Sequence, residues 1–156
     1  MKLTYQEIRE KYNNNNFEKP NYFFHGSSKL LKQVEPNKSH DSDNNKVNID
    51  TAVFVTPSIL IASAYSFKDS IKELSNKKGL RWDFNVVESE TIPIMTMKNV
   101  VVNKNFEGYL YVFVNDGSFV NEPVGSLQYK SYLALVPIDI IIISYQDYQN
   151  YYEIRG

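Results

Sequence analysis

Short apolar and aromatic runs, separated by polar stretches, recur along most of the chain and predict more strands than helices. The runs at 21–25 and 51–55 predict two buried strands. The run at 108–114 is apolar or aromatic on both faces and predicts a central strand of a sheet. Further strands are predicted within 82–87, 92–102, 129–136 and 137–144, the last with its isoleucines on one face.

Residues 1–20 are predicted to form an N-terminal helix and a linker. The helix spans 4–12, because Thr4 and Glu7 have the spacing of a capping box. The four asparagines at 13–16 end it, since asparagine favours turns over helix interiors.

A longer helix is predicted after the strand at 51–55. Thr56 would cap it and Pro57 would occupy its first turn. Asn76 and Gly79 would end it. Tyr65 is expected at the edge of the buried face. That face consists of apolar residues at helical spacing, namely Leu60, Ala64, Phe67, Ile71 and Leu74.

These elements together predict an α+β fold, with two or three helices on a split, largely antiparallel sheet. We expect residues 1–156 to form a single domain. The polar stretch 36–50 is predicted to be an exposed loop. His40, Asp41 and Asp43 in this loop lack a rigid frame, so no metal site is predicted there.

Composition narrows the function classes. Of 156 residues, 42% are hydrophobic, which is enough for a core, and the formal net charge of −1 gives no general attraction to nucleic acid or an anionic membrane. The lack of cysteine excludes disulfides, thiolate metal sites and cysteine nucleophiles. No apolar run has the length of a transmembrane helix, and the N-terminus lacks the core of a signal peptide, so a cytoplasmic protein is expected.

Candidate chemistry begins at the strand predicted over 21–25. This strand ends in His25, and Gly26 and Ser27 follow. A polar side chain at the end of a buried strand is a common place for a binding site in mixed folds, and glycine allows a ligand to approach the backbone closely. A plain strand followed by a turn has the same pattern, so the motif gains weight only together with later stretches.

Three stretches combine with it in a fixed order. The first is Phe24-His25-Gly26-Ser27, the second is the strand with Phe54 and the helix with Tyr65, and the third comprises 108–111, 119–123 and 131–138. This order resembles the ADP-ribosyltransferase superfamily, in which a strand ends in His-Gly-Thr/Ser and an aromatic strand and helix follow. In particular it resembles the small, single-domain rifamycin ADP-ribosyltransferases. The resemblance covers most of residues 21–145.

The resemblance implies binding of NAD, cleavage of its nicotinamide–ribose bond, and transfer of ADP-ribose to an acceptor, either a small molecule or a protein. Such a cleavage passes through an oxocarbenium-like state. His25 would bond a ribose hydroxyl, Gly26 and Ser27 would hold the carboxamide, and Phe54 and Tyr65 would stack on the nicotinamide ring.

The acidic residue of the family pattern is assigned to Glu122, in the Phe-x-x-acid-Pro segment, with Asp116 as the second candidate. Many relatives carry glutamate in the late strand, where this chain has Ser131. The usual tyrosine of the second strand is Phe54, which keeps the ring but lacks the hydroxyl. The loop at 36–50 would border the site and help to select the acceptor.

Three alternatives remain open from the sequence. Phe54 and Ser131 are compatible with an inactive relative that binds a nucleotide or a partner protein. An RNA phosphotransferase of the same fold would need several arginines for phosphate groups, whereas Arg9, Arg81 and Arg155 are scattered. A structural or interaction protein without a ligand would have no site near His25.

Overall fold

An α+β arrangement of α-helices and small β-sheets makes up the part of the chain that the computed structural model describes, namely residues 3–30, 34, 37–38, 51–79, 83–87, 94–98, 102–151 and 153–155. Neighbouring strands in the described part of the chain pair antiparallel, except for one parallel pair, which includes the strand near the C-terminus. The α+β class predicted from the sequence is therefore confirmed. None of the described helices is long and apolar enough to cross a membrane.

The main sheet has the order β1 (Tyr22–Ser27), β6 (Glu107–Val114) and β9 (Asp139–Ser144). β6 is its central strand, as the apolar run predicts, and its residues 110–113 are buried. β1 pairs with β6 so that His25 lies opposite Tyr111 and Gly26 lies opposite Leu110. The isoleucines at 138, 140 and 142 alternate with more buried positions and are all exposed.

The alternation of β1 divides the core between the two faces of the main sheet. Phe24 points into a cluster formed with α2 (Ile59–Lys77), α1 (Tyr5–Lys11) and α3 (Tyr145–Tyr148). Phe23 points into a second cluster, with Tyr111 and the valines of β3 (Thr51–Val55). Successive side chains of a strand face opposite sides, so one short aromatic run supplies both clusters.

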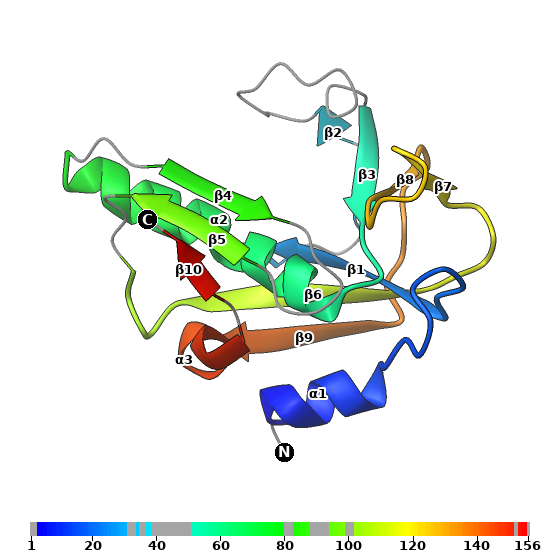
Figure 1. Ribbon diagram of the computed structural model, residues 1–156, viewed down its shortest axis with the longest axis horizontal. Helices are drawn as coiled ribbons and strands as arrows, with labels where there is room; N and C mark the ends of the chain where they lie inside the picture. Colours follow the sequence, from blue (N-terminus) through cyan, green and yellow to red (C-terminus); the bar gives the residue numbers. More distant parts are fainter. Residues whose placement is uncertain are drawn as a thin grey trace.

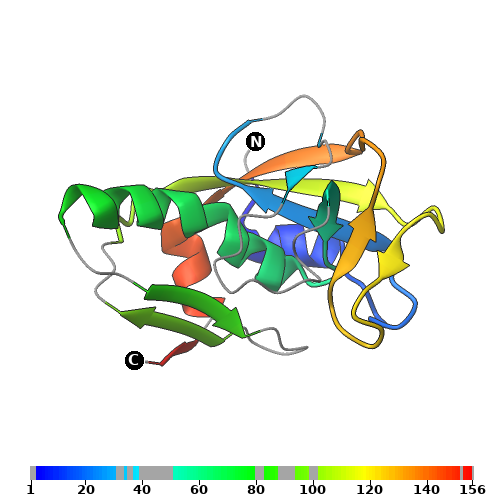
Figure 2. The ribbon, with the colours of Figure 1, turned by 90° about the horizontal axis from the view of Figure 1, so that it is seen from above.

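Two glycines allow α2 to lie directly on the main sheet. A methyl group at Gly26 would overlap the carbonyl oxygen of Ala62 and would lie 2.8 Å from the backbone nitrogen of Ser66. A methyl group at Gly108 would overlap the side chain of Ser66. Figure 2 shows α2 lengthwise between this sheet and strands β4 and β5. The absence of a side chain at Gly26 is thus required by helix packing.

A second sheet has the order β2 (Asn37–Lys38), β3, β8 (Tyr129–Ser131) and β7 (Val120–Asn121). Phe54 lies opposite Lys130, and Lys130 also lies opposite Val120. A third sheet joins β10 (Glu153–Arg155), β5 (Ile94–Lys98) and β4 (Asp83–Val87). Figure 1 places the second and third sheets at opposite ends of the molecule.

The structure corrects several predicted boundaries. The N-cap of α2 is Ser58, whose hydroxyl accepts from Ile61 N, while Thr56 pairs with β1 instead. The strand predicted over 129–136 is limited to β8, and the one over 137–144 begins at Asp139. The segment after β9 contains α3, a 3₁₀ helix (Gln149–Tyr151) and β10. Within 36–50, Asn37–Lys38 form β2, and the rest of the predicted loop, including His40, lies outside the described residues.

Candidate functional site

Strands β1 and β3 meet at one residue pair and then stop pairing. Phe24 and Thr56 exchange backbone hydrogen bonds, with N···O distances of 2.8 and 3.0 Å, as an isolated bridge. A regular antiparallel ladder would next join Gly26 to Phe54. Among the described residues no such bond is formed. We call the region bounded by His25, Gly26 and Phe54 the fork.

The backbone of Gly26 faces the fork. Hydrogen-bonding groups alternate between the two edges of an antiparallel strand, so Gly26 directs its N–H and C=O to the same edge as Phe24. Phe24 bonds Thr56 on that edge, whereas no described residue bonds either group of Gly26 there. Gly26 therefore offers one donor and one acceptor, side by side, at the fork.

The imidazole of His25, next to Gly26 in β1, spans the fork to β3. Its Nδ1 lies 2.8 Å from the carbonyl oxygen of Phe54. A carbonyl can only accept, so Nδ1 carries the proton and Nε2 is left as an acceptor in the neutral ring. Burial lowers the pKa of His25 below its ordinary value, although the bond to Phe54 acts in the opposite direction. The ring is consequently held neutral and in one tautomer.

Phe54 connects His25 to the second sheet. Its carbonyl accepts from His25, while its side chain lies on the same face of the second sheet as its cross-strand partner, Lys130. The Lys130 ammonium is 5.7 Å from the centre of the Phe54 ring, within the range of a cation–π contact. In an antiparallel sheet, the side chains of a cross-strand pair lie closest together when the two residues do not hydrogen-bond through their backbones, and the contact between Phe54 and Lys130 is consistent with such a pair.

Glu122 joins the same group through Lys130. Its Oε1 lies 3.1 Å from the Lys130 Nζ, and its side chain is 42% exposed. The backbone is fixed on both sides by Gln128, which accepts from the Glu122 N–H and donates to its C=O. His25, Phe54, Lys130 and Glu122 are thus linked by contacts although they come from three separate stretches of the sequence.

Asp116, the second candidate acid, lies elsewhere. It follows β6 in a turn, where Ser118 donates two bonds to its Oδ1, and these bonds lower the pKa of Asp116. The preceding residue, Asn115, bonds Asn21 before the start of β1, whereas His25 lies near its other end. Four residues of strand separate these positions by about 13 Å. The structure therefore favours Glu122 over Asp116.

Ser27 and Tyr65 flank the fork more loosely. The Ser27 hydroxyl accepts from the Lys29 N–H, which leaves its own proton for a further bond. Tyr65 is on α2, three residues after Ala62, which packs against Gly26. Its side chain is 37% exposed, and the Lys68 ammonium lies 5.9 Å from its ring. A sandwich of Tyr65 and Phe54 around a ligand stays a prediction.

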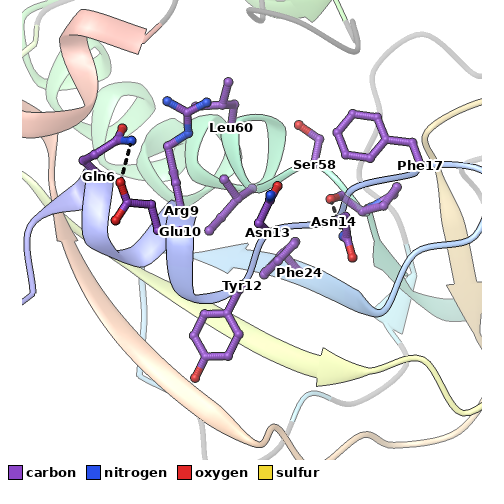
Figure 3. Close-up of a pocket in the computed structure, with 12 residues that line it drawn as sticks. Gln6, Arg9, Glu10, Tyr12, Asn13, Asn14, Phe17, Phe24, Ser58 and Leu60 are labelled. Atoms are coloured by element: carbon purple, nitrogen blue, oxygen red, sulfur yellow. Dashed lines mark hydrogen bonds between the residues drawn. The ribbon is translucent and has the colours of Figure 1, made fainter.

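A cavity of about 270 Å³ lies between α1 and the first turn of α2, and Phe24 is among the residues that line it. Figure 3 shows Arg9 and Glu10 of α1, and Ser58 and Leu60 at the start of α2, among the residues around it. None of the site residues predicted from the sequence lines it. In the described part of the chain, no cluster of histidines and carboxylates has the arrangement of a metal site.

Lys130 is the residue of this group to which sequence reasoning assigned no role. It is fully buried, which is rare for lysine. The only sequence feature that could have indicated its burial was its position between Tyr129 and Ser131 in a strand, but a lysine in a short strand is usually exposed to solvent.

Comparisons with protein-family models, with curated proteins and with solved structures give no match to this chain.

Proposed function

We propose that this protein is an NAD-dependent mono-ADP-ribosyltransferase. The observation that carries the proposal is the fork. Gly26 presents an adjacent backbone donor and acceptor there, and the neutral His25 and the carboxylate Glu122 belong to one connected group. The order of the sequence motifs supports the same reading.

The donor set of the fork fits the nicotinamide end of NAD. A carboxamide has one acceptor oxygen and an NH₂ donor, which complement the Gly26 N–H and C=O. Ser27 would add a hydroxyl donor. Phe54, which forms one side of the fork, would stack on the pyridine ring, and Tyr65 would close the other side.

The reaction requires cleavage of one C–N bond. The bonding electrons pass to the pyridine nitrogen, so nicotinamide leaves neutral and the ribose carbon gains oxocarbenium character. The acceptor oxygen or nitrogen then bonds that carbon and loses a proton. Glu122 would stabilise the positive ribose and orient the acceptor, because a fixed carboxylate near a developing positive charge lowers the barrier.

His25 would act on the ribose. With Nδ1 donating to Phe54, its Nε2 is left to accept a bond from a ribose hydroxyl. Protonation would remove this acceptor. Because the pKa of His25 is lowered, we expect binding of NAD to weaken only as the pH falls below the ordinary range of histidine.

Release of nicotinamide from labelled NAD tests the proposal, with water as the acceptor when none is supplied. We expect His25→Ala and Glu122→Gln each to reduce turnover by about 100-fold, the scale of one stabilising group in a transition state. Asp116→Asn is the matched carboxylate control and should retain wild-type turnover. The proposal is wrong if the wild-type chain releases no nicotinamide from NAD.

A second candidate is a protein that binds NAD without cleaving it. Ser131 favours this reading, because its hydroxyl is engaged with the backbone of Leu133, as donor and as acceptor, and is thus part of a turn. Calorimetry distinguishes the two candidates. Heat of NAD binding that is lost in His25→Ala, without nicotinamide release at any enzyme concentration, would select the binding protein.

A further inference from the structure

Lys130 is a buried cation beside the proposed site. Its side chain is fully buried, and it is the one charged residue among the largest fully buried side chains of the described chain. Removing an ammonium from water is costly unless it is paired and hydrogen-bonded. An apolar residue would fill the same position in a strand without this cost, so stability alone does not explain a lysine here.

Two contacts of Lys130 involve residues of the proposed site. Its Nζ lies 3.1 Å from Glu122 Oε1 and 5.7 Å from the centre of the Phe54 ring. It therefore touches the carboxylate and the ring assigned to the ribose and to nicotinamide. Glu122 makes no hydrogen bond through its other oxygen, Oε2, to any described residue. Lys130 thus holds one carboxylate oxygen and leaves the second for another partner.

We propose that Lys130 is a positioning residue for the transfer reaction, and this inference rests on the function proposed above. It fixes Glu122 Oε1 from the buried side, so that Oε2 is directed towards the ribose and the acceptor. Its contact with Phe54 also holds the ring against which nicotinamide would stack. Lys130 does not touch the substrate. It acts through Glu122 and Phe54, because a displacement of about 1 Å at a reacting group can reduce a rate 100-fold.

Steady-state kinetics of NAD hydrolysis test this role, with Lys130→Met as the variant of similar length without charge. We expect kcat to fall about 10- to 100-fold, with KM for NAD within about threefold of wild type, since Lys130 makes no contact with NAD. Lys11→Met is the matched control. It removes a surface lysine from an ion pair with Asp139, 3.8 Å long, and should leave both constants unchanged.

A double-mutant cycle separates positioning from packing. If Lys130 acts through Glu122, Lys130→Met should have little further effect on kcat in a Glu122→Gln background. A full additional loss in that background would show that Lys130 acts otherwise and would overturn the inference. So would a Lys130→Met enzyme with wild-type kcat.

One measurement does not depend on turnover. A buried, bonded ammonium exchanges its protons slowly, so its ¹⁵Nζ resonance should be observable by NMR in the wild type and should shift or broaden in Glu122→Gln. Absence of this coupling would overturn the inference even if the variant lost activity through misfolding. Absence of nicotinamide release from the wild type would instead overturn the proposed function and this assignment with it.

Discussion

The hydrogen bond from His25 Nδ1 to Phe54 O, 2.8 Å long, sets the chemistry of the histidine at the residue scale. It selects the tautomer, and burial favours the neutral ring. A histidine in this state serves as an acceptor at Nε2, and it also makes the folded protein sensitive to acid. The same feature thus has a functional and a thermodynamic consequence.

The free energy of unfolding should fall as the pH is lowered below about 6.5, the ordinary pKa of histidine. His25 has a lowered pKa in the folded state, so the unfolded chain binds more protons in this range and acid favours unfolding. His25→Asn retains a donor for Phe54 O but does not titrate. Urea unfolding between about pH 5 and 7.5 should therefore show a weaker pH dependence for the variant. Parallel curves for the two proteins would contradict this expectation, since His40 is present in both.

Gly26→Ala should destabilise the protein by about 2–3 kcal/mol, at the upper end of the cost of overpacking. The added methyl group would overlap the Ala62 carbonyl, and a helix backbone cannot rotate away as a side chain can. Gly117→Ala is the control. A methyl group at Gly117 would contact nothing, and only the φ of +85° disfavours a residue with a side chain. We therefore expect this substitution to destabilise the protein by about 1 kcal/mol. Equal losses in denaturant unfolding would show that α2 does not press on β1.

Sequence reasoning identified some residues of the candidate site because their types are unusual in their context. His25 stood out at the end of an aromatic strand. Glu122 was assigned through the order of motifs, and contacts among Lys130, Phe54 and His25 now connect it to the fork. Lys130 had no such signal, because it lies between two cross-strand neighbours, one of which, Phe54, is far away in sequence.

At the scale of elements, the capping box of α1 shows a strictly local determinant. The Thr4 hydroxyl accepts from the Glu7 N–H at 3.2 Å, and a Glu7 carboxylate oxygen accepts from the Thr4 N–H at 3.0 Å. These bonds lower the pKa of Glu7. All the information for this helix start lies within four residues, so the sequence predicted it correctly.

Thr4→Ala should lower the free energy of unfolding by about 1 kcal/mol, the usual value of an N-cap. Thr4→Ser retains the hydroxyl and should stay close to the wild type. Denaturant unfolding measures both. Because α1 is anchored by the buried Tyr5 and Ile8, hydrogen exchange of the Glu7 amide should report the loss of the cap more strongly than exchange in α2. A Thr4→Ala protein as stable as Thr4→Ser would argue against the cap.

Other boundaries were predicted incorrectly where tertiary contacts decide them. Thr56 has the sequence features of an N-cap, but its backbone is used by Phe24, and the helix begins after Ser58 instead. The apolar run after Tyr129 suggested a longer strand. β8 ends at Ser131, whose side chain bonds the backbone of Leu133 and turns the chain.

At the scale of the whole molecule, the helices near both ends of the described chain, α1 and α3, are hydrogen-bonded to α2. Tyr5 of α1 and Ser63 share a hydrogen bond of 2.7 Å, and Tyr148 of α3 donates to the Leu60 carbonyl at 2.8 Å. Burial raises the pKa of both phenols, which therefore stay protonated at physiological pH. Such bonds cross 58 and 88 residues of sequence, and no local pattern indicates them.

Tyr148→Phe should lower the free energy of unfolding by about 1–3 kcal/mol, because it leaves the Leu60 carbonyl without this buried donor. Tyr109→Phe removes a hydroxyl that bonds no described residue and should cost less than about 0.5 kcal/mol. Fluorescence and circular dichroism should give coincident transitions for both variants if the helices and the main sheet unfold together. Separate transitions in Tyr148→Phe would show that α3 detaches independently.

The pair of bonds between Phe24 and Thr56 has a mechanical consequence. It acts as a pivot, because the described parts of β1 and β3 share no other backbone bonds. Gly26 is two residues from the pivot, about 7 Å along the strand. A rotation of roughly 10° between the strands would therefore move the Gly26 backbone by only about 1 Å, whereas residues further from the Phe24–Thr56 pair would be displaced more. A ligand at Gly26 would thus lie close to the pivot, where the bond from His25 to the Phe54 carbonyl also limits the relative movement of the two strands.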